Sequence, residues 1–509
     1  VFVYILRFVY GYWTRKNVPS LQPVALVGNF LDLWLTKATM PEVEQRLCQQ
    51  LPDEPLIGAY YGTEPCLIVQ DPQFIKIVTT KDFYYFCNRE ISAHAHKEQL
   101  AKNLFQASGD DWKVLRQNLT PIFTSAKMKK MFSLIEQCSK QLENVLDEQT
   151  KTKEVFEIRE WISRFTMDCI GSCAFGINTR AMVGSDDNPF SKMGKHFFKQ
   201  TVNRFIKLHT RAMWPKLFYS LGFELNPQET STFFFKFLNN VFEHRHDSSM
   251  RNDFIDLIKT FKNRKYISGD SIRNLKNNSN DRVKMDVNDD LLSAQCFIFF
   301  LAGYETSATT ASFTLYELAK NQDAQEKARV EIDEFLERHE GVLHYECVNE
   351  LKFLDQCVDE ALRLYPVLGV ITREVSDTYE FADVKLTLEK GTRVHLPVFH
   401  IHRNPKYFSE PNTFRPDRFS PDEKRNIIQY TYFPFGEGPR TCIGMRFAKM
   451  QVLAGLVTVL KKYRVDLAEG TPSTIEFDPM AFVTQSKKPI NLKMTVIQLC
   501  LLRMKTIMY

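Results

Sequence analysis

The sequence lacks the patterns that mark several common functional classes. None of its 11 cysteines form a Cys-x-x-Cys pair, and the closest spacing is Cys169-x-x-x-Cys173. The absence of such pairs argues against a structural zinc site and against a disulfide framework. No Gly-x-Gly-x-x-Gly or P-loop pattern occurs, so no signature for a nicotinamide, a flavin or a nucleotide is present. The 66 basic and 61 acidic residues nearly balance and no long basic tract occurs, so nucleic acid is not an expected partner. Because the cysteine count is odd and most of these residues lie in apolar surroundings, we expect a reducing compartment.

The N-terminal end also lacks a full membrane span. Residues 1–13 are apolar and aromatic, but a bilayer-spanning helix needs about 20 apolar residues, and the sequence does not begin with methionine. We interpret residues 1–16 as part of a membrane anchor, with Arg15 and Lys16 as its cytoplasmic flank. Residues 17–30, which contain two prolines, are expected to form a linker. An amphipathic surface segment is the alternative interpretation of the N-terminal run.

Composition and periodicity predict a helix-rich fold with a large core. Hydrophobic residues make up 44% of the chain, with 41 phenylalanines. Most of residues 110–261 have helical periodicity, and residues 289–321 are apolar on most faces up to Gly303, which indicates a long buried helix. Short strands are expected at 58–69 and 385–397. The polar stretch 263–288 is expected to be a mobile surface loop.

One cysteine stands in an unusual local setting near the C-terminal end. Cys442 lies in a glycine-rich loop beside Arg440, and the apolar stretch 444–460, which follows directly, is expected to be a helix. A helix N-terminus and a guanidinium both favour a thiolate. A thiolate without a second cysteine nearby is a nucleophile or a single metal ligand, and cysteine is a known proximal ligand of heme iron. Considered alone, Cys442 fits a buried structural cysteine better, because free cysteines are usually buried and inert.

The residues around this cysteine resemble a known family signature. Phe435-x-x-Gly438-x-Arg440-x-Cys442-x-Gly444 matches the heme-binding signature of the cytochrome P-450 superfamily at every fixed position. Three further motifs stand in the family's order: Ala302-Gly303-Tyr304-Glu305-Thr306-Ser307, Glu360-Ala361-Leu362-Arg363, and Phe414-Arg415-Pro416-Asp417-Arg418-Phe419, with Asp417 in place of the commoner glutamate. Trp112-x-x-x-Arg116 followed by Thr120-Pro121 further resembles microsomal members that oxidise xenobiotics, above all those of insects. The resemblance implies one mainly α heme-thiolate domain over residues 31–509, with small β-sheets and a buried central helix.

This resemblance implies the cofactor and its ligands. The expected cofactor is heme, iron protoporphyrin IX, with the iron ligated by Cys442. Its two propionates need cations and hydrogen-bond donors, which we expect from Arg440, Arg373 and the pair Trp112 and Arg116, which share one helix face. Further heme contacts are expected from Phe435, Gly436, Gly444, Ala302 and Gly303.

Two other groups of residues have roles implied by the resemblance. Glu305 and Thr306 are expected to act as an acid–alcohol pair that relays protons to the oxygen-binding site. Burying this pair costs free energy unless it finds partners, and the Thr306 hydroxyl can bond the carbonyl one turn back. Glu360, Arg363 and Arg418 are expected to form a buried, purely structural salt-bridge triad.

The implied reaction is the insertion of one oxygen atom of O2 into lipophilic small molecules such as plant toxins and insecticides. Apolar side chains at five positions are expected to line the substrate pocket: Phe297, Phe300, Val370, Ile371 and Phe482. An endogenous hormone or fatty-acid hydroxylase is an alternative. So are a heme-thiolate isomerase or dehydratase acting on peroxides, and a non-catalytic heme protein.

The same resemblance implies protein partners and a location. Because the chain has no nicotinamide or flavin signature, electrons are expected from NADPH through a separate cytochrome P-450 reductase, with cytochrome b5 as a further candidate. A basic face would suit an acidic reductase, and its residues are expected to be Lys113, Lys127, Lys129, Lys130, Arg446 and Lys449. The expected location is the cytoplasmic face of the endoplasmic reticulum membrane.

Overall fold

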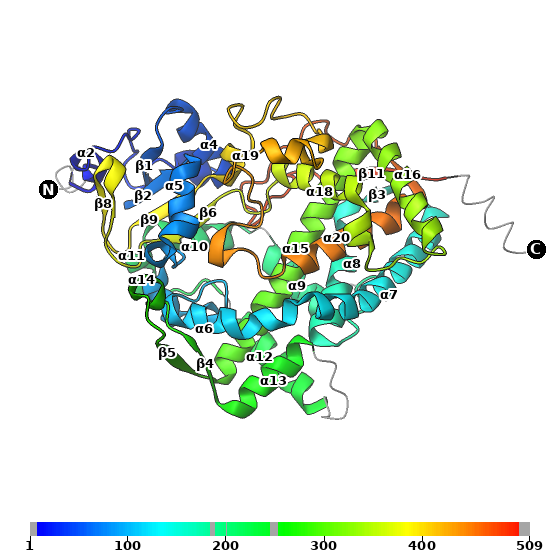
Figure 1. Ribbon diagram of the computed structural model, residues 1–509, viewed down its shortest axis with the longest axis horizontal. Coiled ribbons are helices and arrows are strands. Elements are labelled where there is room, and N and C mark those ends of the chain that lie inside the picture. Colours follow the sequence, from blue (N-terminus) through cyan, green and yellow to red (C-terminus); the bar gives the residue numbers. More distant parts are fainter. Residues whose placement is uncertain (1–7, 184–188, 200, 227, 245–252, 498–509) are drawn as a thin grey trace, which may run out of the picture.

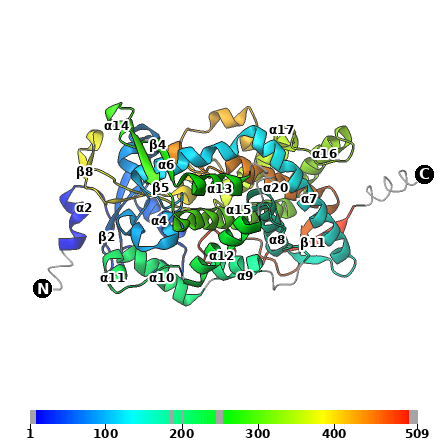
Figure 2. The same ribbon diagram turned by 90° about the horizontal axis from the view of Figure 1, so that it is seen from below.

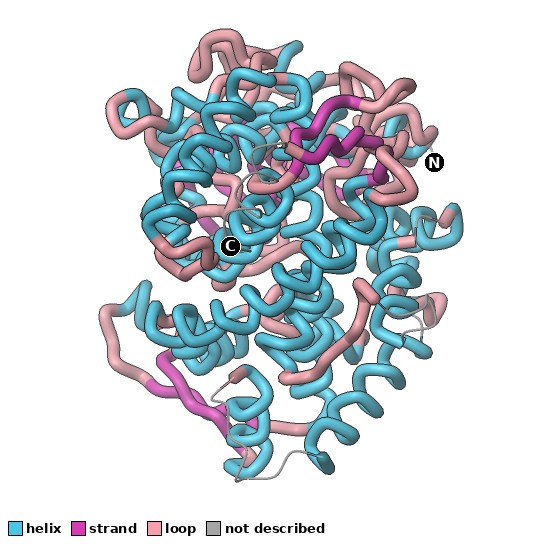
Figure 3. Tube along the Cα trace, turned by 90° about the vertical axis from the view of Figure 1, so that its right-hand side faces the viewer, coloured by secondary structure: helices cyan, strands magenta, loops and turns pink. Residues whose placement is uncertain are grey.

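The computed structural model describes residues 8–183, 189–199, 201–226, 228–244 and 253–497. Helices dominate these residues, as predicted, and the strands form small separate sheets (Figures 1 and 3). The helices besides those described below are α2 (Tyr12–Arg15), α3 (Leu31–Trp34), α4 (Met40–Gln50), α5 (Pro72–Lys76), α7 (Ser125–Thr150), α9 (Pro189–Phe198), α10 (Val202–Met213), α11 (Pro215–Ser220), α13 (Phe254–Arg264), α14 (Asn274–Asn277), α16 (Gln322–Arg338), α17 (Cys347–Glu350) and α19 (Val398–His402).

The predicted buried helix is α15 (Asp289–Lys320), which runs through the middle of the molecule (Figure 1). Asn288 caps its N-terminus by accepting a hydrogen bond from the backbone N–H of Leu291, and two aspartates occupy the first turn, where the helix dipole favours them. Its neighbours include α8 (Ile158–Ile170), α12 (Gln228–His244), α18 (Lys352–Leu364) and α20 (Met445–Leu460). Since α15 is apolar on nearly all faces, it is buried among these helices.

The largest sheet has four strands in the order β1-β2-β9-β6, namely β1 (Leu56–Tyr61), β2 (Glu64–Val69), β9 (Arg393–Leu396) and β6 (Ile371–Glu374). β2 and β9 are parallel, and the other neighbours are antiparallel. A three-stranded sheet has the order β10-β11-β3, with β10 (Tyr463–Leu467), β11 (Asn491–Val496) and β3 (Val155–Glu157). The antiparallel pair β7 (Tyr379–Phe381) and β8 (Leu386–Leu388) follows β6 in the chain.

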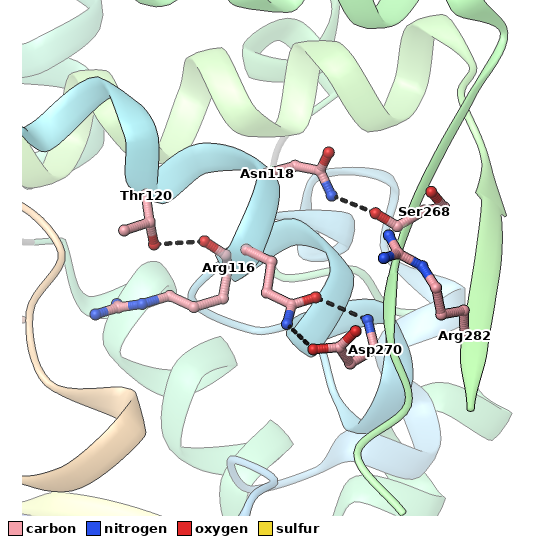
Figure 4. Close-up of a pocket in the computed structure, with 7 residues that line it drawn as sticks. Arg116, Asn118, Thr120, Ser268, Asp270 and Arg282 are labelled. Carbon is pink, nitrogen blue, oxygen red and sulfur yellow. Dashed lines mark hydrogen bonds between the residues drawn. The ribbon is translucent and has the colours of Figure 1, made fainter. Parts of the chain in front are cut away.

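The expectation of a mobile loop at 263–288 was wrong. This stretch forms the hairpin β4 (Tyr266–Asp270) and β5 (Arg282–Asp286), which packs on α6 (Gly109–Leu119). Gln117 exchanges two hydrogen bonds with Asp270, and the Asn118 amide donates to the carbonyl of Ser268 at 2.9 Å (Figure 4). A side chain at Gly269 would lie 2.5 Å from Gln117 Oε1, so the strand can approach α6 because this residue is glycine. These partners lie about 150 residues away in the sequence, so the local polarity of the stretch concealed them.

The described part of the expected N-terminal anchor packs on the four-stranded sheet. Trp13 is fully buried and donates a hydrogen bond from its indole N–H to the carbonyl of Ala59 at 2.8 Å. The expected linker also touches the sheet, because Ser20 bridges Gly58. In the ranges that the structure describes, no helix has both the length and the apolar character required to cross a bilayer. Residues 1–7 lie outside those ranges, and the anchor and linker stay predictions.

Candidate active site

The loop that carries Cys442 folds back on itself in front of α20. The backbone N–H of Cys442 donates to the carbonyl of Phe435 at 2.9 Å, and that of Gly436 donates to Phe433 at 2.9 Å. Gly436 and Gly438 both have positive φ angles, of 75° and 71°, a region that favours glycine. A side chain at Gly438 would collide with the carbonyl oxygen of Thr79. The loop therefore depends on glycine both for its turn and for its close contact with a neighbouring segment.

Among the ten cysteines that the structure describes, Cys442 alone has an exposed side chain. Although this side chain is accessible, desolvation by the protein packed around the loop raises the pKa of its thiol. A hydrogen bond from the Gly444 backbone, together with Arg116 and Arg89, opposes this effect only in part. Arg440, which was expected to favour the thiolate, is not among the groups that lower the pKa of Cys442. A bound metal ion would deprotonate the thiol directly, so the raised pKa is compatible with a ligand role.

Four arginines converge near this loop without any acidic partner. Arg116, Arg373 and Arg440 were expected there, and the structure adds Arg89 from the segment that precedes α6. None of the four forms an ion pair with a carboxylate in the described ranges. The Nε atoms of Arg89 and Arg373 are buried without a hydrogen-bond partner in these ranges. Burial and mutual repulsion lower the pKa of Arg440 well below its ordinary value, and burial lowers that of Arg373 to about 10.

Buried cations without counter-ions are costly, so this cluster requires an anionic group. A heme with two propionates beside the Cys442 thiol satisfies that requirement, because guanidinium groups bind carboxylates with two hydrogen bonds. The residues present therefore fit heme. Arg89 was missed in the sequence because it stands in no motif. Its only local signal is a charged pair, Arg89-Glu90, which follows the aromatic run 83–86 after two intervening residues.

The expected propionate ligands differ in how they are held. Arg440 lies over the ring of Trp112, with 4.5 Å between its Cζ and the ring centroid, and donates to the carbonyls of Cys87, Phe105 and Ala107. Arg116 donates to the carbonyl of Thr441 at 2.8 Å, which ties α6 to the cysteine loop. Trp112 and Arg116 thus reach the loop from one helix face, as their spacing indicates.

The acid–alcohol pair on α15 points in two directions. Thr306 lies on the accessible face with Ala302, and its hydroxyl donates to the Ala302 carbonyl at 2.6 Å. Glu305 is buried on another face, where it forms an ion pair with Arg159 of α8 and accepts a hydrogen bond from Gln485. Consecutive helix residues are about 100° apart, so their side chains cannot share one face. Gly303 faces α8, where an added Cβ would lie 2.5 Å from the Ile170 side chain.

The structure brings the expected triad together in the core. Arg363 makes two hydrogen bonds with Glu360, at 2.7 and 2.8 Å, and donates to the backbone carbonyls of His402 and Pro411. Arg418 donates to Glu360 at 3.2 Å. Because both Glu360 and Arg363 are fully buried, the triad joins α18 firmly to the chain segments that precede the cysteine loop.

Comparison with known proteins agrees with this geometry. The family model of cytochrome P450 matches residues 18–494 of the chain. The chain belongs to the cytochrome P450 family. It is 36% identical over 479 residues to "Cytochrome P450 6B1" of Papilio polyxenes, covering 94% of this chain and 93% of that protein. It is 35% identical to "Cytochrome P450 6k1" of Blattella germanica, covering 96% and 93%, and 35% identical to "Cytochrome P450 6a2" of Drosophila melanogaster, covering 94% of each.

This cytochrome P450 is therefore an enzyme of the monooxygenase class, and its family implies heme. When bound, heme with a thiolate ligand supplies the activation of dioxygen. The side chains that would hold it are Cys442 for the iron and Arg89, Arg116, Arg373, Arg440 and Trp112 for the propionates.

A cavity of about 280 Å³ in this cytochrome P450 adjoins Arg89. Val370 and Phe482, two of the expected substrate-pocket residues, line it. Phe297 and Phe300 instead lie in an aromatic cluster with Phe197, Phe234 and Phe190, because they occupy other faces of α15. Ile371 is buried in β6 and faces Gly436. The structure thus places these three outside the lining of the cavity.

Proposed function

We propose that this cytochrome P450 is a microsomal monooxygenase that oxidises lipophilic xenobiotics with electrons delivered from NADPH by a separate reductase. The observation that carries the proposal is the accessible thiol of Cys442 beside buried arginines that lack carboxylate partners. Cys442 would hold the iron, and the arginines would orient the heme through its propionates. Thr306, whose hydroxyl donates to the Ala302 carbonyl on the accessible face of α15, would pass protons through that hydroxyl.

The substrate class rests on the lining of the cavity. Its walls are largely apolar and aromatic, and they include Leu33, Phe105, Leu208, Val370, Phe399, Phe477 and Phe482. Such walls favour lipophilic molecules by removing their surface from water. The relatives named above are insect cytochromes P450, and a detoxifying role is part of this proposal.

Electron delivery is proposed to use the lysines at the start of α7, of which Lys129 and Lys130 are exposed and Lys127 is half-buried. Lys127 and Lys130 form no ion pair in the described ranges, whereas Lys129 pairs with Glu346 at 2.7 Å. Of the other expected members of the basic face, Lys449 pairs with Asp355, and Arg446 donates to Ser125. The unpaired lysines would attract an acidic reductase, and attraction of this kind weakens as salt rises.

Charge reversal tests this part of the proposal. We expect the double variant Lys127→Glu/Lys130→Glu to raise the apparent KM for an added reductase severalfold at low salt, and less at high salt. Lys140→Glu, farther along α7 and paired with Glu136, serves as the matched control. Unchanged reductase kinetics in the double variant at low salt would contradict the assigned face.

The carbon monoxide difference spectrum of the reduced protein tests the function itself. We expect a strongly red-shifted Soret band in the native chain and its loss in Cys442→Ala. Turnover that requires NADPH, dioxygen and reductase would then separate a monooxygenase from a peroxide isomerase, which requires none of them. A band at the position of imidazole-ligated heme would overturn the assignment of Cys442.

A further inference from the structure

Part of the cavity wall is polar and is built from segments that are distant in the sequence. Tyr61 of β1, Glu90 of the segment before α6, and His209 and Arg211 of α10 all line it. No motif of the heme site includes Glu90 or His209.

Glu90 is held from behind by buried His395, which is held in turn by buried Glu44. One of its carboxylate oxygens bonds His395 Nε2, and His395 Nδ1 lies 2.6 Å from Glu44 Oε1. An imidazole bonded to carboxylates at both nitrogens is stable as a cation. Burial would raise the pKa of Glu90, but His395 and Arg393 outweigh this effect and lower it. Glu90 is therefore a carboxylate at neutral pH, and its Oε2 has no hydrogen bond from the described residues.

His209 is fixed in the same way by Tyr61, whose hydroxyl lies 2.5 Å from His209 Nδ1. Burial lowers the pKa of His209 to about 4 and raises that of Tyr61, so at neutral pH the imidazole is neutral and the phenol donates. With Nδ1 accepting, the ring proton of His209 is on Nε2, which makes that atom a donor. Tyr61 lies between the two histidines, with ring centroids 6.2 Å from His209 and 6.5 Å from His395.

Arg211 does not offer a free cation beside them. Its Nε donates to the hydroxyl of Tyr219 at 2.5 Å and lies 3.6 Å from Glu98 Oε1. Of these four side chains, Glu90 thus presents an acceptor, Oε2, and His209 presents a donor, Nε2–H, each oriented by buried partners. Arg89, Gln106 and Asp478 also line the cavity.

We propose that Glu90 and His209 form a polar subsite that selects lipophilic substrates carrying a hydroxyl group. The hydroxyl donates to Glu90 Oε2 and accepts from His209 Nε2–H, while the apolar body of the substrate fills the rest of the cavity. A hydrocarbon leaves both groups without partners, an ether cannot donate to Glu90, and a carboxylate is repelled by it. This inference rests on the proposed function, because it assumes that substrates enter this cavity.

Equilibrium dialysis of four probes against the heme-loaded protein tests the subsite. The probes share one body: 4-phenylbutan-1-ol, its methyl ether, butylbenzene and 4-phenylbutanoate. We expect the alcohol to bind about tenfold more tightly than the ether, in line with the discrimination that buried polar groups achieve. Equal binding of alcohol and ether, or tightest binding of the carboxylate, would overturn the proposal.

Three variants test whether Glu90 and His209 cause the preference for the alcohol. We expect Glu90→Gln and His209→Leu to reduce the preference for the alcohol and to leave the affinity for butylbenzene unchanged. Tyr61→Phe keeps the ring but frees His209 Nδ1, so it should reduce the preference without disturbing Glu90. Tyr463→Phe is the matched control, because this tyrosine is also buried and hydrogen-bonded, to Asp147, but does not line the cavity. A preference that persists in all three variants would contradict the assigned residues.

The carbon monoxide spectrum of each variant separates this failure from failure of the proposed function. A normal red-shifted band in a protein that does not prefer the alcohol would contradict only the proposed subsite. Absence of the band in the native chain would contradict the proposed function. If Glu90→Gln fails to fold because His395 loses its partner, Tyr61→Phe still decides the question.

Discussion

At the scale of single residues, the glycines of the loop before α20 differ in how much room they leave for a side chain. Gly438 combines a φ of 71° with a contact to the backbone of Thr79 that leaves no room for a side chain. Gly444 has an ordinary negative φ, and the nearest atom to an added Cβ, on Phe123, lies 3.8 Å away. The two fixed glycines of the same signature therefore have different physical roles.

These two glycines give a matched pair of variants. We expect Gly438→Ala to lose most of its heme content, because the new methyl group would force the cysteine loop away from its neighbour. Gly444→Ala should keep a heme content close to that of the native chain. The ratio of heme to protein in purified samples measures both, and equal ratios would contradict this account.

The buried triad gives a second prediction at this scale. Arg363→Met leaves the Glu360 carboxylate buried and largely uncompensated, so we expect a loss of about 3–5 kcal/mol in the free energy of unfolding. Arg46→Met removes an exposed pair with Asp32 and should cost about 1 kcal/mol or less. Denaturant unfolding of both variants compares them, and similar losses would argue against a structural role of the triad.

At the scale of elements, the contact between α15 and α8 fixes the acid on the central helix. Gly303 allows Ile170 to lie against the backbone of α15, and Arg159 reaches Glu305 from the same helix. The close approach and the ion pair thus both join α15 to α8.

We expect Gly303→Val to destabilise the protein by about 1–3 kcal/mol through overpacking against Ile170. Ile170→Ala in the same chain should recover part of this loss, because it removes the colliding atoms. A double-mutant cycle measured by thermal unfolding checks the coupling. Strictly additive effects would show that the two residues do not share this contact.

Helix α19 makes the fold sensitive to acid. Burial lowers the pKa of His400 to about 4 and of His402 to about 3, with Arg363 and Arg403 also lowering the latter. Because the unfolded chain has ordinary histidine pKa values near 6.5, it binds more protons than the fold below that pH. Stability should therefore fall as pH drops from about 7 towards 4, by about 2 kcal/mol for each histidine at pH 5.

His402 also accepts a hydrogen bond from the backbone N–H of Phe433 at 3.0 Å, just before the cysteine loop. We expect His402→Gln to flatten the dependence of unfolding free energy on pH between 7 and 5. The amide can still accept the hydrogen bond but does not titrate. An unchanged slope would show that His402 does not carry this effect.

At the scale of the whole molecule, α10, α11 and the turn after them lie on the same side as α2 (Figure 2). These segments carry several exposed apolar side chains. They are Val202, Ile206, Leu217, Leu221 and Phe223. An apolar surface of this kind is suited to contact with a bilayer, which would add to the proposed microsomal location.

Vesicle flotation tests this surface. We expect Leu217→Glu/Leu221→Glu to reduce binding of the full chain to phosphatidylcholine vesicles severalfold, because charged groups resist burial among lipids. Val330→Glu changes an equally exposed apolar residue on α16 and serves as the control. Equal binding by both variants would contradict a role for α10 and α11.

The sequence by itself determined the features that depend on short-range order. The Cys442 loop, the buried helix α15 and the pairing of Glu360 with Arg363 are local in the chain. Apolar periodicity predicted the helix, and the resemblance to family motifs implied the loop and the pair. The family followed from the same motifs. Tertiary structure decided the rest, because it depends on helix phase and on distant partners. Glu305 meets Arg159 across 146 positions, the hairpin meets α6 across about 150, and Arg89 joins the other arginines only in the fold.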